Sequence, residues 1–177
     1  MPIHLIQAGF LSDTWGPPQS QGYYVYSFDQ LGIVDTFDVV QYDHRYPNGG
    51  PRGAWEEIIV KMRGRHIDSL KKAKGIHDVN PPDTITFDCS PTTLSTNFFS
   101  YSLYCYLENN KIPDCSIKHL DSVRIGNVAF YDVLLDTRND TTGDFAFCRG
   151  IGMLWKKPIG GESGKKFYDA TLLKYSK

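Results

Sequence analysis

The stretch from Asp144 to Trp155 reads DFAFCRGIGMLW, and it indicates the fold more clearly than any other part of the chain. Bulky and small side chains alternate along it, which is the period of a β-strand. Phe145, Phe147 and Trp155 belong to the bulky set, and Arg149 is the one charged residue in that set. We therefore predict a long strand over residues 144–155 with one apolar face.

Strand-like patterns on both sides of this stretch predict the rest of the fold. They lie at Ile3 to Phe10, Tyr23 to Phe28, Ile33 to Tyr42, Thr84 to Cys89, Asn97 to Leu107, Ser122 to Leu135 and Phe167 to Tyr175. Long antiparallel strands tend to curl or close, which removes exposed sheet edges. We predict a mainly β protein, built as an antiparallel β-barrel or a strongly curved sheet, with an α+β fold as the alternative.

The period of the apolar residues changes between Ala54 and Ala73. There the apolar residues fall at helical spacing on one face, which predicts one helix at about residues 54–74. Gly64 weakens the middle of that helix, so a short strand followed by a helix is a second interpretation of the same stretch.

The length and composition of the chain exclude several classes of protein. A chain of 177 residues fits one domain, residues 1–177. It has no apolar run long enough to span a membrane. A formal net charge of -1 argues against generic nucleic-acid binding, which needs a basic surface. We therefore expect neither a membrane nor a nucleic-acid partner, and a homo-oligomer is left open.

The cysteines and histidines show no metal-site or redox spacing. The four cysteines include no Cys-x-x-Cys pair, so we expect no metal and no cofactor. The N-terminus lacks the pattern of a signal peptide, and the plain interpretation is a cytoplasmic protein with reduced thiols. A mature secreted form is the alternative.

Two features suggest a polar lining inside an apolar pocket. Tyr104 and Tyr106 share one face of the predicted strand Asn97 to Leu107, where aromatic rings with hydroxyls are typical of a cavity wall. Ordinary surface tyrosines are the alternative. Arg149 within an apolar row must be paired or face a cavity, and Asp132 on the preceding predicted strand is its candidate partner. Arg149 then either binds an anion or carbonyl, or serves structure at a rim or in an ion pair.

His44 is the candidate for proton transfer. It follows Asp43 at the end of a predicted strand and precedes a glycine turn, where an imidazole can act as general acid or base. A solvated loop histidine is the alternative interpretation.

Residues 140–153, DTTGDFAFCRGIGM, resemble the late-strand motif of dirigent proteins. The matching residues are Gly143, Phe145, Arg149 and Gly150. The predicted strand Phe167 to Tyr175 corresponds to the last strand of that family, so the resemblance covers residues 140–175. It implies the eight-stranded barrel that dirigent proteins share with allene oxide cyclases. Such barrels hold an apolar ligand in the lumen and guide its folding or ring closure.

Together these features favour a small-molecule pocket protein that acts on an apolar substrate as a non-redox cyclase, isomerase or dehydratase. The catalytic candidates are Arg149 to polarise a carbonyl, Asp132 to orient Arg149, and His44 for proton transfer. The candidate substrate-binding residues are Tyr104, Tyr106, Phe147 and Trp155. Two alternatives stay open: a ligand-binding barrel without chemistry, and a viral or effector-type interaction module without a small-molecule site.

Overall fold

A computed structural model describes residues 22–46, 57–77, 81–90, 93–96, 99–102, 116–136, 145–148, 150–156 and 169–176. These residues form eleven strands: β1 (Tyr23–Phe28), β2 (Ile33–Arg45), β3 (Glu57–Gly64), β4 (Thr84–Ser90), β5 (Thr93–Thr96), β6 (Phe99–Ser102), β7 (Ile117–Ile125), β8 (Val128–Asp136), β9 (Phe145–Cys148), β10 (Gly152–Lys156) and β11 (Ala170–Tyr175). A single turn of 3-10 helix, η1 (Asp29–Leu31), connects β1 to β2, and an α-helix, α1 (Ile67–Ala73), follows β3.

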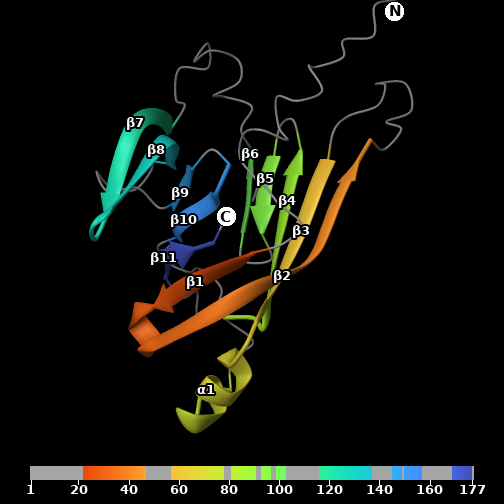
Figure 1. The fold of residues 1–177 in the computed structure, drawn as a ribbon, viewed down its shortest axis with the longest axis vertical. Helices are drawn as coiled ribbons and strands as arrows, with labels where there is room; N and C mark the ends of the chain where they lie inside the picture. Colours follow the sequence, from red (N-terminus) through yellow and green to blue (C-terminus); the bar gives the residue numbers. More distant parts are fainter. Residues whose placement is uncertain are drawn as a thin grey trace, which may run out of the picture.

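All eleven strands belong to one antiparallel sheet in the order β6-β5-β4-β3-β2-β1-β11-β10-β9-β8-β7. The sheet curls into a half-barrel, with β1 and β2 crossing below the other strands (Figure 1). We call β1–β6 the first wing and β7–β11 the second wing, and the pairing of β1 with β11 joins them. The prediction of a mainly β protein with a strongly curved antiparallel sheet is confirmed.

The stretch predicted as a helix at about 54–74 divides into two elements. Glu57–Gly64 is strand β3, where Ile58, Val60 and Met62 are buried at a spacing of two. Only Ile67–Ala73 is helical, so the interpretation that breaks the stretch near Gly64 describes it better. The strand forms because β2 and β4 lie on its two sides, and this pairing outweighs the local helical spacing.

The chain changes from β3 to α1 around the buried carboxylate of Asp35. That carboxylate accepts hydrogen bonds from the backbone N–H of Thr36 at 2.8 Å and of His66 at 2.9 Å. A Cβ atom on Gly64 would lie 2.8 Å from Oδ2 of Asp35 and 2.9 Å from Ile67. Glycine at position 64 therefore lets the backbone pass close to the side chains of Asp35 and Ile67, just before the helix begins.

Two predicted long strands are in fact hairpins, and glycine explains both differences. The predicted strand Ser122 to Leu135 turns at Gly126, whose φ is 57°, between β7 and β8. The predicted strand 144–155 turns between β9 and β10, where Gly150 has φ 68° and Gly152 has φ 102°. Such positive φ values suit glycine and end a strand, so the single face predicted for 144–155 does not form.

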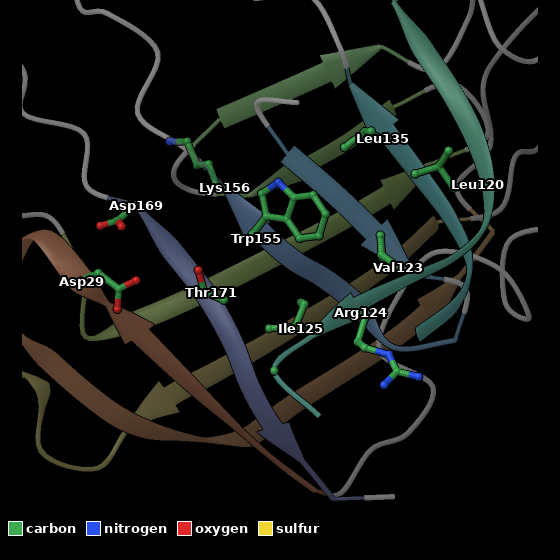
Figure 2. Close-up of a pocket in the computed structure, with 11 residues that line it drawn as sticks. Asp29, Leu120, Val123, Arg124, Ile125, Leu135, Trp155, Lys156, Asp169 and Thr171 are labelled. Atoms are coloured by element: carbon green, nitrogen blue, oxygen red, sulfur yellow. The ribbon is translucent and has the colours of Figure 1, made fainter. Parts of the chain in front are cut away.

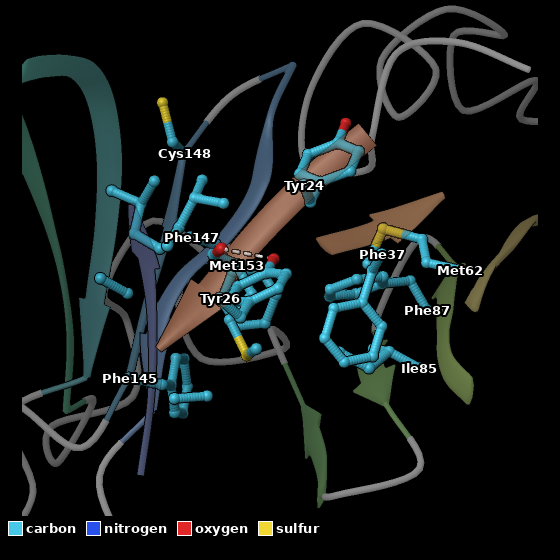
Figure 3. Packing of buried hydrophobic residues seen from close by; sticks show 14 of the residues in the cluster. Tyr24, Tyr26, Phe37, Met62, Ile85, Phe87, Phe145, Phe147, Cys148 and Met153 are labelled. Carbon is cyan, nitrogen blue, oxygen red and sulfur yellow. Dashed lines mark hydrogen bonds between the residues drawn. The ribbon is translucent and has the colours of Figure 1, made fainter. Parts of the chain in front are cut away.

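The interior of the half-barrel is filled by side chains from both wings. Phe37, Met62 and Phe87 come from the first wing, and Phe145 and Phe147 come from the second (Figure 3). Tyr26 of β1 lies between the two groups, and its hydroxyl donates a buried hydrogen bond to the carbonyl oxygen of Met153 at 3.0 Å (Figure 3). This bond reaches past β11 and ties the first wing to the second.

Candidate functional site

The second wing is buried on both faces of its central strands. All four residues of β9 are buried, and three residues of β10, Gly152 to Leu154, are buried in succession. One face of these strands lies against the interior of the half-barrel, where Phe147 and Met153 pair. The other face is covered by β7, which curls across it (Figure 2).

A groove of about 660 Å³ lies between β7 and this second face (Figure 2). Its apolar lining consists of Leu120, Val123 and Ile125 of β7, Leu135 of β8 and Trp155 of β10. The three residues of β7 are half-buried, and each packs partly against the core. Binding sites for small molecules commonly have this volume and this mostly apolar lining.

The sheet register explains why Trp155 faces the groove. Trp155 pairs with Ala146 on one side and with Thr171 on the other, and Leu135 also pairs with Ala146. Directly paired residues of antiparallel strands share a face, so these residues form one row across the sheet. Ala146 at the centre of the row has a small side chain, which leaves room beside the indole.

A register shift between Met153 and Trp155 determines which face of the sheet Phe147 lies on. Phe147 pairs with Met153, on the face opposite to Trp155, and it is 1% exposed within the core. Its ring packs edge-on against Phe145 with centroids 5.4 Å apart. Of the two aromatic residues predicted to contact substrate from one face, only Trp155 therefore lines the groove.

Charged residues lie at the two ends of the groove. Asp29, Asp169 and Lys156 lie toward one end and Arg124 lies at the other (Figure 2). Asp169 accepts a hydrogen bond from the backbone N–H of Gln30 at 3.2 Å, which fixes η1 beside the start of β11. A ligand in the groove would therefore meet an apolar middle with charges at both ends.

Lys156 is an unusual member of this lining because it is only 4% exposed. It pairs with Phe145 and with Ala170, both of them buried and apolar. This environment disfavours an ammonium ion, and burial lowers the pKa of Lys156 to about 8. A larger share of Lys156 is therefore a neutral amine near neutral pH than is usual for lysine.

Trp155 has a second property that bears on the groove. Its indole Nε1 is buried and has no hydrogen-bond partner among the described residues. A buried donor without an acceptor costs about 1–3 kcal/mol, so such groups are rare in folded proteins.

The candidates for catalysis are not brought together by the described part of the chain. Asp132 of β8 lies 2.6 Å from Nε2 of His119 across the β7–β8 pair, and it has a φ of 61°, a strained value for a residue other than glycine. His44 lies near the end of β2, exposed, with its ring 5.1 Å from that of Tyr46. Four strands separate β2 from β8 in the sheet.

Three further candidates, Arg149, Tyr104 and Tyr106, lie outside the described residues. Cys148, which follows Phe147 at the end of β9, donates its S–H to the carbonyl of Tyr131 at 3.1 Å. Burial raises the pKa of its thiol to about 11, so it stays protonated at neutral pH.

Sequence reasoning missed most of the groove. Leu120, Val123 and Ile125 lie in a stretch with four charged or histidine side chains between Ile117 and Ile125, which obscures the strand pattern. The groove exists because β7 crosses the sheet, and that crossing is a tertiary feature. The hydrophobic spacing of 120, 123 and 125 was the available signal, and it is weak.

No group of three or more His, Cys, Asp or Glu side chains suited to a metal ion occurs among the described residues. Within the same residues, no helix is long and apolar enough to cross a membrane. No protein-family model, curated protein or solved structure matches the chain. The resemblance to dirigent proteins therefore stays a prediction.

Proposed function

We propose that the protein binds a small, mainly apolar molecule in the groove between β7 and the second face of β8, β10 and β11. The observation that supports this proposal is the set of half-buried apolar side chains around Trp155 in a space of about 660 Å³. A ligand would remove these side chains from water, at about 25 cal/mol for each Å² of apolar surface.

The proposal is limited to binding, because the two proton-transfer candidates among the described residues lie away from the groove. His44 lies at the end of β2 in the first wing, and Asp132 already contacts His119. Neither residue lines the groove. A cyclase, isomerase or dehydratase needs an acid or base within hydrogen-bond reach of the bound substrate, and these two residues do not meet that condition here.

A matched pair of substitutions in one hairpin tests this proposal. Val123 lines the groove, whereas Val128 begins β8, is 43% exposed and lies outside the groove. We expect Val123→Glu to weaken binding of the fluorescent probe anilinonaphthalene sulfonate by about tenfold or more, because it places a charge on an apolar wall. Val128→Glu should leave binding unchanged.

Fluorescence titration measures both affinities, and thermal unfolding of each variant shows that it is folded. A second variant, Trp155→Ala, removes the largest apolar side chain of the lining and should also weaken binding. Equal affinities for the wild type, Val123→Glu and Trp155→Ala in folded protein would refute the groove as the binding site.

A further inference from the structure

We propose that the ligand of the groove is an apolar amine, whose ammonium group binds the carboxylates of Asp29 and Asp169 while its apolar body lies against Trp155. This inference rests on the proposed binding function and names the chemical class of the ligand. It is drawn from the charges at one end of the groove, to which an uncharged apolar molecule would bring no partner.

The sheet register extends the face of the groove from β10 across β11 to β1. Thr171 of β11 pairs with Trp155 on one side and with Ser27 of β1 on the other, so these three residues share a face. Asp169 lies two residues before Thr171, and Asp29 directly follows β1. Both aspartates line the groove at the end of this row (Figure 2).

Each of the two carboxylates is held by one neutral donor. The hydroxyl of Ser27, a residue only 7% exposed, donates to Oδ1 of Asp29, and the backbone N–H of Gln30 donates to Oδ1 of Asp169 at 3.2 Å. Within the described part of the chain, no cationic side chain forms an ion pair with either carboxylate. A carboxylate has about four lone-pair positions, so both can accept further hydrogen bonds from a ligand.

The two cations that border the groove leave this negative charge in place. Lys156 pairs with Phe145 and Ala170, both of them in the core, so the register directs its side chain to the face opposite to Trp155. Arg124 lies at the other end of the groove (Figure 2). The end with the two carboxylates is therefore complementary to a cation.

An apolar amine satisfies both parts of the groove. Its body would remove Trp155 and Ile125 from water, and the indole ring would also attract a nearby cation. Its ammonium group has three N–H donors, and hydrogen bonds between two charged groups are stronger than those from a neutral hydroxyl. An anionic aromatic molecule would instead have to turn its charge toward Arg124 at the other end.

Calorimetry with three ligands that share one aromatic body tests the inference on the full chain. The ligands are naphthylmethylamine, naphthalenemethanol and naphthoic acid, which are cationic, neutral and anionic at neutral pH. We expect the amine to bind about tenfold more tightly than the alcohol, because only the amine forms charge-assisted hydrogen bonds with the carboxylates. The acid should bind more weakly than the amine, and added salt should reduce the advantage of the amine over the alcohol.

Asparagine variants test whether the two carboxylates produce this preference. Asp29→Asn and Asp169→Asn keep the shape and one acceptor oxygen of each side chain but remove its charge. Each should lower the ratio of amine to alcohol affinity several-fold, and the double variant should bring it close to one. Asp121→Asn is the matched control, because Asp121 is an exposed carboxylate of β7 outside the groove lining, and it should leave the ratio unchanged. Thermal unfolding shows that each variant is folded.

The outcomes separate the two proposals. The amine inference is overturned if the wild type binds amine and alcohol equally, if the acid binds at least as tightly as the amine, or if the folded double variant keeps the wild-type ratio. If naphthalenemethanol binds in such a case, and Trp155→Ala weakens its binding, the groove proposal stands alone. If none of the three compounds binds, both proposals fail.

Discussion

The two wings of the sheet cover their apolar side chains in different ways. In the first wing, buried and half-buried residues alternate along residues 23–26 of β1 and 57–62 of β3, so one face of these stretches lies in the core. Val34 and Val40 of β2, on the outer side, are more than half exposed, at 52% and 54%. In the second wing, β9 is buried on both faces.

This difference explains where the groove lies. A strand with one buried face needs one covering layer, and the core supplies it. A strand with two buried faces needs a second layer, and in the second wing β7 supplies that layer only in part. The first wing therefore acts as the scaffold, and the second wing leaves space that a ligand can fill.

The largest expected effect tests this contrast directly with substitutions in the two wings. Phe37 is fully buried, and its ring packs edge-on against Tyr26 at 6.0 Å and Phe28 at 6.1 Å. We expect Phe37→Ala to lower the free energy of unfolding by about 3–5 kcal/mol. Val123→Ala at the groove should cost about 1 kcal/mol or less, because its side chain is already partly in contact with water.

Urea denaturation measures both values, and Phe37→Leu provides a milder variant if Phe37→Ala does not fold. Similar losses for Phe37→Leu and Val123→Ala would contradict the distinction between a packed first wing and an open second wing.

The second prediction concerns the helix of the first wing. Asp35 is 4% exposed and accepts two backbone hydrogen bonds, one from Thr36 and one from His66 just before α1. Asp35→Ala leaves both partly buried N–H donors without this acceptor, and we expect a loss of about 2–4 kcal/mol. Asp68→Ala, an exposed residue in the first turn of α1, is the control and should change stability little.

Thermal unfolding followed by circular dichroism compares these two variants. If Asp35→Ala unfolds at the same temperature as Asp68→Ala, the buried carboxylate does not organise the junction of β3 and α1.

The third prediction concerns the connection between the wings. Tyr26→Phe removes the hydroxyl that donates to the carbonyl oxygen of Met153, and it leaves that buried acceptor with one bond fewer. We expect a loss of about 1–2 kcal/mol. Tyr131→Phe is the matched control, because Tyr131 is 68% exposed, and it should be neutral. Hydrogen exchange of the β10 amides should rise in Tyr26→Phe, and unchanged exchange would show that the bond does not couple the wings.

Strands β1 and β2 were more predictable from sequence than the strands of the second wing, for a physical reason. Strand β1, at Tyr23 to Phe28, matches its prediction because its residues are mostly aromatic, and aromatic residues favour strands. In the second wing, the turns at Gly126 and Gly150, where φ is positive, lie inside longer strand-like patterns, and β9 is buried on both faces and therefore shows no alternation. Trp155, predicted to contact substrate together with Phe147, lines the groove, but its separation from Phe147 depends on a register shift that spacing does not reveal.

The smallest expected effect is electrostatic and lies on the outer surface of the first wing. Arg65 donates two hydrogen bonds of 2.7 Å to the carboxylate of Asp38, and both side chains are largely exposed. The hydrogen bond from Arg65 lowers the pKa of Asp38 below its usual value. Solvent screens an exposed pair, so its contribution to stability should be less than that of the Tyr26 hydroxyl.

The sign of the effect with pH follows from the direction of the shift. A carboxylate with a lowered pKa in the folded state contributes stability above its unfolded pKa and loses that contribution as the pH falls through the folded value. The stability difference between wild type and Asp38→Asn should therefore be constant near neutral pH and disappear as the pH falls through the lowered pKa of Asp38. Because the pair is screened, added salt should reduce the neutral-pH difference but leave the Tyr26→Phe difference unchanged. Urea titrations at several pH and salt values measure this, and a salt-independent difference would place the pair among the buried interactions of the core.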